Sequence, residues 1–516
     1  MADVYCVYIN ADKNTAQIYN GQDTVYKNDL RILDEINLSR KSICFVPSVK
    51  IICRLFPGGE LHEDEEYAKN GDSDYLTYNY GNIEFRSFGA LINMQTASSI
   101  LTMFNTDSTA EAMYLYLCEL GDPIKVKYTL AYQAKKEFYK GIEDELWEER
   151  KKLKKFYYDM ETYNDMMAGV KSGVLSDYTA KYFENVIRYD IKSAYASIMV
   201  TDNKFPVGKL KKINCGDYQY KITVIQRCMR KEEWVKVVID GKMESFNRWY
   251  DKKYDKTALE FYNLKTLDLI GILDEFYSKL QGREFTVYTS NKTDYLNELV
   301  RDRIIERYDL KESLPKNSVR RYLVKTQIEV LCGKGIQDHS FDNIKDVQNH
   351  YRGKGHGSNY MCPEMSMHCI AAIEYELYNA IANCDTKYFD TDGVSVDYND
   401  ETKRYFDKRN QEIRKRNLEA GYDTSIGVWD CEGKVDRMLV FTPKIYIYES
   451  NGNIIFKAAG VDKEYREQII NALGSNAINY MRLNGFTTLA KKYLIDCGKL
   501  KVIFVPGHLS GDIQKG

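Results

Sequence analysis

Two aspartates separated by one residue stand in segment 387–397, which reads Lys-Tyr-Phe-Asp-Thr-Asp-Gly-Val-Ser-Val-Asp. In a strand, side chains two residues apart share a face, so Asp390 and Asp392 are predicted to point together. The pair Asp392-Gly393 favours a tight turn here. Crowded carboxylates repel one another, and a hard divalent cation relieves that repulsion. The same pattern also suits a surface hairpin whose aspartates only form the turn, and the motif alone leaves both interpretations open.

A third carboxylate favours the metal site. Asp190 ends an apolar strand in segment 188–198, Arg-Tyr-Asp-Ile-Lys-Ser-Ala-Tyr-Ala-Ser-Ile, and a turn is expected directly after it. An aspartate at such a place would supply the opposite wall of the site. Two ions about 3.5–4 Å apart, held between Asp190 and Asp392, would activate an attacking hydroxyl and neutralise phosphoryl charge.

Alternating strands and helices must position these carboxylates, which predicts an α/β (α+β) fold. Strands are expected at 186–191 and in the hairpins 387–398 and 438–459, the second with an Asn451-Gly452 turn. Helices are expected at 259–280, at 294–336 with a break near Pro315, and at 365–382, while the glycine-bearing segment 338–361 is expected to be a polar loop.

Composition limits the function classes. The 516 residues correspond to roughly three domains. The net charge is −2, so a nucleic-acid site would be a local channel and not a basic surface. The 43 tyrosines suit stacking on bases, and a coding bias explains them equally well.

Twelve cysteines without a CxxC pair indicate reduced thiols and no structural zinc. Neither a signal peptide nor an apolar run of membrane-spanning length is expected, which favours the cytoplasm, that of a host cell for a viral protein.

Both carboxylate motifs resemble the palm motifs of family B DNA polymerases. Segment 190–197, Asp-Ile-Lys-Ser-Ala-Tyr-Ala-Ser, resembles DxxSLYPS, and segment 388–393, Tyr-Phe-Asp-Thr-Asp-Gly, resembles YxDTDS. Segment 441–446, Phe-Thr-Pro-Lys-Ile-Tyr, resembles the K-x-Y element that follows. The likeness is greatest to the compact protein-primed polymerases of small phages and linear plasmids. It extends over about residues 185–516 and is weak over 1–184.

The resemblance implies a role for each matching residue. Asp190 and Asp392 would bridge two Mg²⁺ ions, or Mn²⁺, with a backbone carbonyl from Ile191, and Asp390 would support the second metal. The nucleotide-binding residues would be Ser193, Ala194 and Tyr195, the tyrosine stacking beneath the sugar and excluding a 2′-hydroxyl. DNA contacts would come from Lys444 and Tyr446 at the primer terminus, and from Lys334. Motif C departs from the family with Gly393 in place of serine, and motif A with Ala196 in place of proline.

The part of the helical block 294–336 that follows its break near Pro315 is expected to bind the triphosphate. Arg321, Lys325, Glu329 and Cys332 recur at intervals of three and four, so they are predicted to share one helix face. Arginine and lysine on such a face suit a triphosphate, and Lys325 resembles the lysine of the family's KxxxNSxYG motif. Glu329 stands where asparagine is usual and Cys332 where tyrosine is usual, which leaves templated synthesis open. An ordinary surface pair of Lys325 with Glu329 is the alternative.

The N-terminal third resembles a proofreading exonuclease without its catalytic residues. Such a domain needs Asp-x-Glu on its first strand and two further aspartates to hold two metals. The first strand here, segment 4–12, contains no paired aspartate and glutamate, and the strand-like segments 44–52 and 83–89 lack the further aspartates. An unrelated domain is the alternative.

The predicted architecture is a right-hand polymerase with palm, fingers and thumb, preceded by an exonuclease-like α/β domain. Its expected divisions are 1–135 exonuclease-like, 136–185 helical linker, 186–258 first palm part with a reduced priming-protein region, 259–337 fingers, 338–362 accessory loop, 363–455 second palm part and 456–516 thumb. The predicted activity is metal-dependent, DNA-directed addition of dNTPs to a 3′-hydroxyl without proofreading. Expected partners are primer and template DNA, dNTPs and a priming terminal protein, with no membrane. A repurposed enzyme that adds nucleotides without template or to a protein, and a non-catalytic DNA-binding module, are the alternatives.

Overall fold

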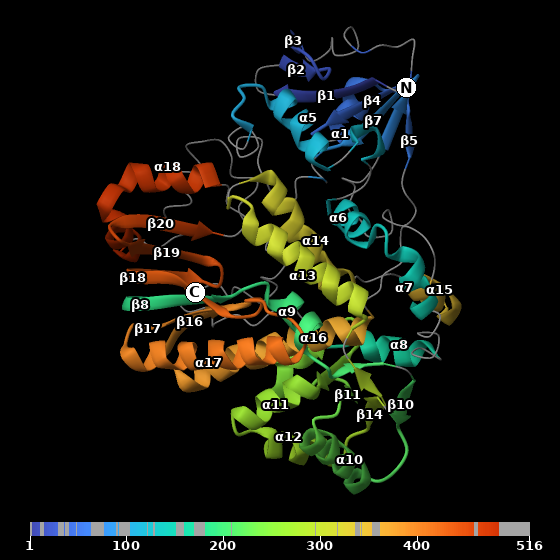
Figure 1. Cartoon of the computed structure of the whole chain (residues 1–516), viewed down its shortest axis with the longest axis vertical. Coiled ribbons are helices and arrows are strands. Elements are labelled where there is room, and N and C mark those ends of the chain that lie inside the picture. The colour runs from blue at the N-terminus through green and yellow to red at the C-terminus, as the bar shows by residue number, and fades with distance from the viewer. Residues whose placement is uncertain are drawn as a thin grey trace. The chain divides into compact units, whose positions relative to one another are not determined.

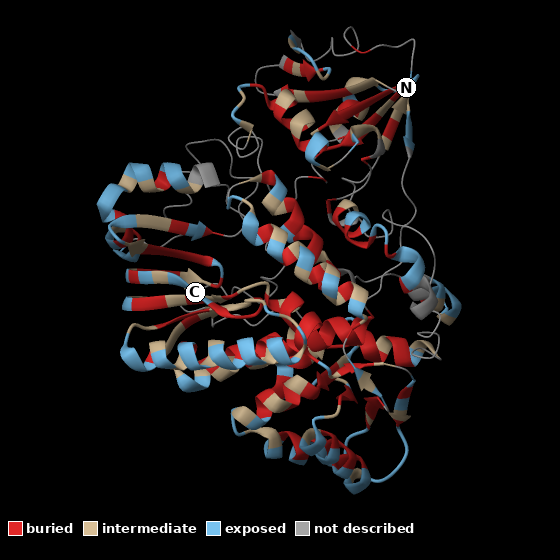
Figure 2. Cartoon of the chain, in the orientation of Figure 1, coloured by how far each residue is buried: buried red, intermediate tan, exposed pale blue. Residues whose placement is uncertain are grey.

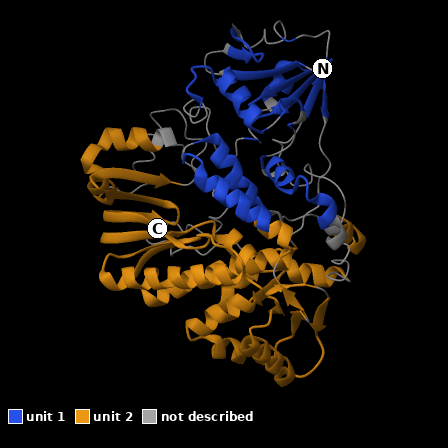
Figure 3. Cartoon of the chain, viewed as in Figure 1, with its two compact units in different colours: residues 1–146, 302–331, 338–342 blue, residues 147–301, 332–337, 343–516 orange. Residues whose placement is uncertain are grey.

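The computed structural model divides the chain into two compact units, each described here by itself (Figure 3). Unit 1 comprises residues 1–146, 302–331 and 338–342, and unit 2 comprises residues 147–301, 332–337 and 343–516. The structure describes residues 3–10, 15–28, 36, 41–47, 49–62, 77–88, 91, 104–120, 122–126, 130–150, 159–169, 181–207, 209–290, 292–294, 296–316, 318–335, 341, 343–352, 362–458 and 463–483.

Unit 1 is built on a seven-stranded sheet in the order β3-β2-β1-β4-β7-β6-β5. Its strands are β1 (Asp3–Asn10), β2 (Thr15–Tyr19), β3 (Thr24–Asn28), β4 (Ser42–Val46), β5 (Glu60–His62), β6 (Thr77–Tyr80) and β7 (Ile83–Ser87). The three central strands β1, β4 and β7 run parallel, whereas the outer pairs are antiparallel. Alternate residues of β4 therefore enter two separate cores.

Helices cover both faces of that sheet. Phe45 packs in a core with α5 (Thr109–Leu120), and Cys44 packs in the other core with α1 (Val49–Leu55). The segment expected to bind nucleotide consists of two helices, α13 (Glu298–Ser313) and α14 (Val319–Gly335), with the predicted break at Pro315. Val319 and Leu323 of α14 lie in the same core as α5. The remaining helices here are η3 (Pro123–Lys125), α6 (Leu130–Tyr139) and α7 (Glu143–Arg150), which runs into unit 2.

Unit 2 contains a six-stranded antiparallel sheet in the order β16-β17-β8-β18-β19-β20. Its strands are β8 (Lys181–Ile191), β16 (Thr386–Asp390), β17 (Gly393–Asp397), β18 (Trp429–Thr442), β19 (Ile445–Ser450) and β20 (Asn453–Ala458). The predicted Asn451-Gly452 turn is confirmed, since it joins β19 to β20 with both residues at positive φ.

Three helices lie along one face of the sheet: α9 (Ala194–Thr201), α16 (Pro363–Asn383) and α17 (Asp400–Glu419) (Figure 1). Tyr189 of β8 stacks on Phe406 of α17, with ring centroids 3.8 Å apart. Because successive strand residues face opposite ways, Asp190 belongs to the other face. At the far edge, α18 (Lys463–Leu473) packs with β19 and β20.

A second, five-stranded sheet completes unit 2. Its strands are β10 (Leu210–Ile213), β11 (Val235–Asp240), β12 (Tyr250–Asp251), β13 (Lys256–Glu260) and β14 (Phe285–Ser290), with the small ribbon of β9 (Phe205–Pro206) and β15 (Thr293–Asp294) beside it. The helices are α8 (Met160–Met167), α10 (Tyr218–Lys231), α11 (Phe261–Leu269), α12 (Leu273–Leu280), α15 (Ile344–Arg352), η5 (Glu244–Trp249) and η6 (Gly474–Asn476).

Two predicted elements differ from the structure. The single helix expected at 259–280 is divided into α11 and α12, because the chain breaks at Gly271, where φ is +75°. The expected loop at 338–361 contains helix α15, whose Val347 is buried, while 353–361 lie outside the described residues. None of the described helices has the length and apolar character needed to cross a membrane.

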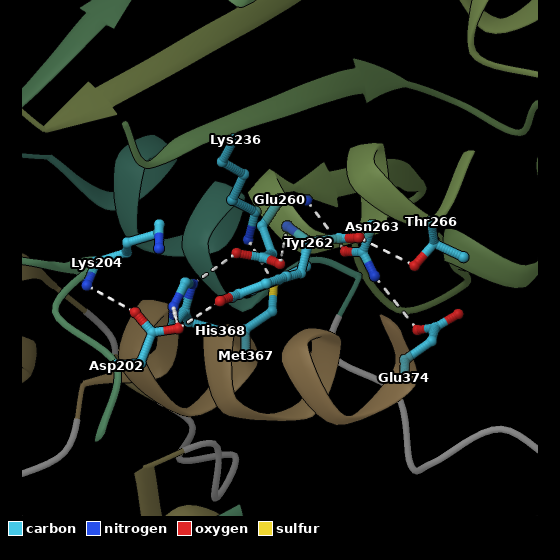
Figure 4. Close-up of polar contacts among 10 residues, drawn as sticks. All are labelled: Asp202, Lys204, Lys236, Glu260, Tyr262, Asn263, Thr266, Met367, His368 and Glu374. Carbon is cyan, nitrogen blue, oxygen red and sulfur yellow. Dashed lines mark hydrogen bonds and ion pairs between the residues drawn. The ribbon is translucent and has the colours of Figure 1, made fainter. Parts of the chain in front are cut away.

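Helix α16 is buried along most of its length and carries charged groups into the core (Figure 2). His368 on this helix is fully buried between two carboxylates (Figure 4). Its Nδ1 lies 2.9 Å from Glu260 Oε2 and its Nε2 lies 3.4 Å from Asp202 Oδ2. The hydroxyl of Tyr262 donates to the same Asp202 oxygen at 2.5 Å. This polar core joins α16 to the loop after α9 and to the start of α11.

The protonation of His368 decides the charge of this core. Burial lowers the pKa of His368, but the charges of Asp202 and Glu260 outweigh it and raise the pKa to about 9. Burial raises the pKa of Asp202, but the charge of His368 outweighs it and leaves that pKa below its ordinary value. The imidazolium therefore forms a buried ion pair at neutral pH.

We predict that His368→Gln lowers the thermal unfolding midpoint strongly at pH 6.5, because breaking a buried pair costs about 3–5 kcal/mol. The folded-state pKa of about 9 lies above the ordinary value of 6.5, so this stabilisation is complete below pH 6.5 and is lost above pH 9. The measurement is the difference in midpoint between wild type and variant across this range.

The nearby Lys236 titrates in the opposite sense, because burial lowers its pKa to about 8. Because Lys236 is present in both proteins, its titration contributes to both curves, and the difference between them reports mainly on His368. A difference that stays constant from pH 6.5 to above pH 9 would show that His368 carries no charge in the folded protein.

Candidate active site

The register of the six-stranded sheet aligns four residues across neighbouring strands. Asp190 on β8 pairs with Gly393 on β17 and with Asp430 on β18, and Gly393 pairs in turn with Asp390 on β16. Paired residues of antiparallel strands point to the same face, so these four residues form one row on the face opposite α9 and α17. The sequence did not indicate Asp430, because only the strand register places it beside Asp190.

Asp392 lies in the turn between β16 and β17 and not within a strand. Its N–H donates to the carbonyl of Asp390 at 2.7 Å, and Thr391 between them has a φ of +58°. This combination describes a γ-turn, which is strained at its central residue, above all for a β-branched side chain. The strand alternation predicted for Asp390 and Asp392 therefore does not apply, because the chain reverses between them.

A backbone hydrogen bond attaches this turn to β8. The N–H of Ile191 donates to the carbonyl of Asp392 at 3.0 Å, so the residue after Asp190 is bonded directly to Asp392. The two aspartates lie on adjacent chain segments of one unit, although they are 202 positions apart in sequence, that is, 392 minus 190. Strained backbone that its surroundings hold in place is typical of functional sites.

The side chain of Asp390 is engaged within the protein. It accepts hydrogen bonds from Tyr388 Oη at 3.1 Å and from Thr391 Oγ1 at 2.8 Å, and Lys444 Nζ lies 3.8 Å from it. The Tyr388 hydroxyl also accepts the N–H of Lys444 at 2.9 Å, and Lys444 has a φ of +65°. Asp390 therefore links the turn after β16 to the turn after β18.

The donor set at this place suits a hard cation. In the described part of the chain, no three His, Cys, Asp or Glu side chains gather closely enough to hold a metal ion. The carboxylate of Asp390 bonds to Tyr388 and Thr391, and its role beside a second metal stays a prediction. Mg²⁺, however, is usually bound by one or two carboxylates together with substrate phosphates and water. Asp190 and Asp392 fit that requirement.

The start of α9 follows Asp190 directly. Ser193 adopts a left-handed conformation at the N-cap (φ 48°, ψ 53°), and Ala194 is buried behind it. Tyr195 is half-buried, and its pKa is raised, first by burial and then by the negative charges of neighbouring groups that include Asp392. The structure thus brings Tyr195 into the surroundings of Asp392.

The residues predicted on α14 lie on one continuous helix at the expected spacing, but their surroundings differ along it. Cys332 is buried, and its sulfur donates to the carbonyl of Ser366 at 3.4 Å. Arg321 donates to the carbonyls of Lys311 and Leu314 and pairs with Glu312 at 3.2 Å. These hydrogen bonds satisfy backbone carbonyl groups at the C-terminal end of α13 and directly after it.

Lys325 is exposed and pairs with Glu329 at 3.2 Å, as the surface-pair alternative expected. Arg321 and Lys325 belong to unit 1, and the aspartates belong to unit 2. The side chain of Lys334 lies outside the described residues.

On the face of the six-stranded sheet that carries Asp190, aromatic and cationic side chains pack together behind the turn at Lys444. Arg188 lies over the rings of Tyr446 and Tyr448, 5.5 Å and 5.0 Å from their centroids, and pairs with Glu432 at 2.7 Å. It also donates to the hydroxyl of Tyr446 at 3.3 Å. Tyr446 is buried and packs 5.3 Å from Tyr388. The sequence did not indicate Arg188, which connects these side chains beneath Asp390.

Gly393 leaves room for the carboxylate of Asp190. A Cβ atom at Gly393 would stand 3.0 Å from Asp190 Oδ1 and 3.4 Å from the carbonyl of Tyr189.

We predict that Gly393→Ser, although it restores the residue usual in the resembled family, displaces the Asp190 carboxylate and weakens Mn²⁺ binding several-fold. Calorimetric titration with Mn²⁺ measures this effect.

The control is Gly452→Ser, a turn position with nothing within 4 Å of its added Cβ. Because Gly452 has a φ of +73°, its substitution strains the backbone and costs stability without touching the aspartates. Unchanged Mn²⁺ affinity in Gly393→Ser would show that Asp190 needs no such space.

Comparisons with known proteins agree with this geometry at the level of the fold. No protein-family model matches the chain, and no curated protein matches its sequence. Among solved structures, the chain is similar to Phi29 DNA polymerase complexed with primer-template DNA, with a TM-score of 0.60 and 12% identity over 91% of this chain and 94% of that chain. The same polymerase complexed with single-stranded DNA gives a TM-score of 0.59, also at 12% identity and the same coverage. Its ternary complex with primer-template DNA and incoming nucleotides gives a TM-score of 0.56 at 13% identity, again with the same coverage. The chain thus has the right-hand polymerase architecture of the Phi29 enzyme.

Proposed function

We propose that this protein is a DNA-directed DNA polymerase of the protein-primed family B type, which adds dNTPs to a 3′-hydroxyl. The observation that carries the proposal is the attachment of the Asp392 turn to the residue after Asp190, by the hydrogen bond from Ile191 N–H to the Asp392 carbonyl. It brings two carboxylate-bearing residues together on the sheet of a polymerase fold. The activity is supported further by the primer-template DNA and nucleotides with which the similar polymerase was solved.

In this proposal the chain supplies a fixed pair of carboxylates. Asp190 and Asp392 would hold two Mg²⁺ or Mn²⁺ ions, and such ions would lower the pKa of the primer 3′-hydroxyl and neutralise charge on the phosphoryl group. The strained Thr391 turn and its bond to β8 keep the two residues in place before substrate binds, so little reorganisation is needed during reaction. The hydroxyl oxygen attacks the α-phosphate as its proton passes to solvent, the new P–O bond forms, and the bond to pyrophosphate breaks.

The neighbouring residues position the substrates. Tyr195 lies within the electrostatic influence of Asp392 and would pack against the sugar. Lys444, held at its turn by Tyr388 and half-exposed, would contact the primer terminus, with Tyr446 supporting the turn from beneath. Lys325 is exposed on α14 and would bind the triphosphate, whereas the bonds of Arg321 to α13 favour a structural role for that residue.

We include the absence of proofreading in the proposal. Strand β1 reads Asp-Val-Tyr-Cys-Val-Tyr-Ile-Asn, without a paired aspartate and glutamate. Hydrolysis of a mismatched 3′ end requires carboxylates at that place to hold two metals.

A second candidate, untemplated or protein-directed nucleotide addition, is favoured by one observation. Cys332, at the position where the resembled family has tyrosine, is buried and bonded to the Ser366 carbonyl. No large side chain from this position can then pack against a nascent base pair, which weakens the selection for correct pairing.

We predict that Asp190→Asn and Asp392→Asn each reduce dNTP incorporation at least about a hundredfold, the loss expected when charge stabilisation in the transition state is removed. Circular dichroism should show that both variants fold. Asp436→Asn, at an exposed position of β18 on the same sheet, is the matched control and should retain wild-type rates. Incorporation by Asp392→Asn at the wild-type rate would rule out the proposed mechanism.

Template dependence and proofreading are tested with one labelled primer. We predict that single dNTPs are added only opposite the complementary template base and that a mismatched 3′ end is not removed. Addition that is indifferent to the template base, or label attached to protein alone, would replace the first candidate by the second. Excision of the mismatched nucleotide would show that the N-terminal domain is an active exonuclease.

A further inference from the structure

Unit 2 contains a cavity of about 240 Å³ on the helix-covered side of the sheet. Ile191, the residue after Asp190, lines it, and successive strand residues face opposite ways, so the cavity lies on the other face of β8 from Asp190. The remaining walls come from α9, α11, α16 and α17 and from Gly427 in the turn before β18. Among the residues predicted to hold metal, nucleotide or DNA, Ile191 is the one that lines this cavity.

The polar wall of the cavity is predominantly cationic. Lys265, Arg409 and Arg416 line it, against the single carboxylate Glu376. Arg409 is fully engaged, because its Nε and Nη2 donate to Glu376 at 2.8 Å and 2.5 Å and its Nη1 pairs with Glu412 at 2.7 Å. Glu376 also accepts from the indole of Trp429 at 3.0 Å. This carboxylate is therefore satisfied by partners other than Arg416.

Arg416 is the residue that lacks a complete set of partners. Its Nε is buried and has no hydrogen-bond partner among the described residues. A buried charged donor without a partner is costly and usually marks a water or ion that completes the site. Arg416 lines the cavity together with Tyr262 and Glu376.

An aromatic surface lies beside these cations. Tyr262 and Tyr375 pack with ring centroids 5.7 Å apart, and Lys265 Nζ lies 5.3 Å from the Tyr375 centroid. The hydroxyl of Tyr262 is held by Asp202 in the polar core that Figure 4 shows, which keeps this wall rigid. Lys265 is partly exposed and pairs with Glu232 at 3.3 Å, so one cation stands where the cavity meets the surface.

We propose that this cavity is a second binding site, separate from the catalytic face, for a small phosphate-bearing anion. The forked donors of a guanidinium match the oxygens of a phosphate, and a phosphate would supply the acceptor that Arg416 Nε lacks. Lys265 and Arg409 are paired with carboxylates, whereas no ion pair of Arg416 is present among the described residues, and this charge favours an anion over a cation. The tyrosine wall accommodates either a free phosphate or the sugar and base of a nucleotide.

The test is calorimetric titration of the full chain with orthophosphate, pyrophosphate and dAMP, in EDTA and at constant ionic strength. EDTA removes divalent metal, so the proposed catalytic site contributes no metal-bridged binding. Binding of all three ligands assigns the site to free phosphate, and binding of dAMP alone assigns it to a nucleotide. Absence of binding by all three, or equal binding of acetate, would overturn the proposal.

Variants of the cavity identify the site. Arg416→Gln should weaken binding about tenfold or more, the value of a lost charge-assisted hydrogen bond. Arg414→Gln, at an exposed position of the same helix, is the matched control and should bind as wild type does. Lys265→Gln, at a partly exposed position, provides a second variant should Arg416→Gln fail to fold. Wild-type affinity in the folded Arg416→Gln protein would contradict the proposal.

The result is independent of the proposed polymerase activity. Asp392→Asn should keep the wild-type affinity for the same ligand, because Asp392 lies outside the cavity lining. Loss of binding in Asp392→Asn would place the ligand at the catalytic face and overturn the assignment of a separate site.

Discussion

The site depends on one backbone hydrogen bond, from the N–H of Ile191 to the carbonyl of Asp392. It joins the end of β8 to a turn that the chain reaches 202 residues later, from position 190 to position 392. The turn itself is strained at Thr391, and the bond to β8 is one of the contacts that hold it. Two carboxylate-bearing residues are thereby kept on adjacent chain segments.

The helices behind the sheet support this arrangement from the opposite face. Helix α16 is buried and carries His368 into a polar core with Asp202 and Glu260. The same helix supplies Glu376, which binds Arg409 of α17 and the indole of Trp429 at the start of β18. Since β18 pairs with β8 at Asp190, the charge network of the helices and the register of the sheet are mechanically connected.

The sequence predicted the elements and the motifs better than their contacts. The hairpin turn at Asn451-Gly452 and the helix break at Pro315 are local signals, and both are present in the structure. The row formed by Asp390, Gly393, Asp190 and Asp430 depends on strand register, which no local pattern specifies. For the same reason the burial of Cys332 and the hydrogen bonds of Arg321 to the end of α13 could not be predicted from helical spacing. That spacing assigns residues to a face of the helix but does not identify the neighbouring element.

The central claim is that Asp190 and Asp392 bind divalent metal at one place. The most direct measurement is a crystal structure of the protein with primer-template DNA, an incoming dNTP and Mn²⁺, in which anomalous scattering locates the metal. A peak is expected at coordination distance, about 2.1 Å, from a carboxylate oxygen of each aspartate. A peak elsewhere, or carboxylates of Asp190 and Asp392 that point apart around an ordered substrate, would contradict it.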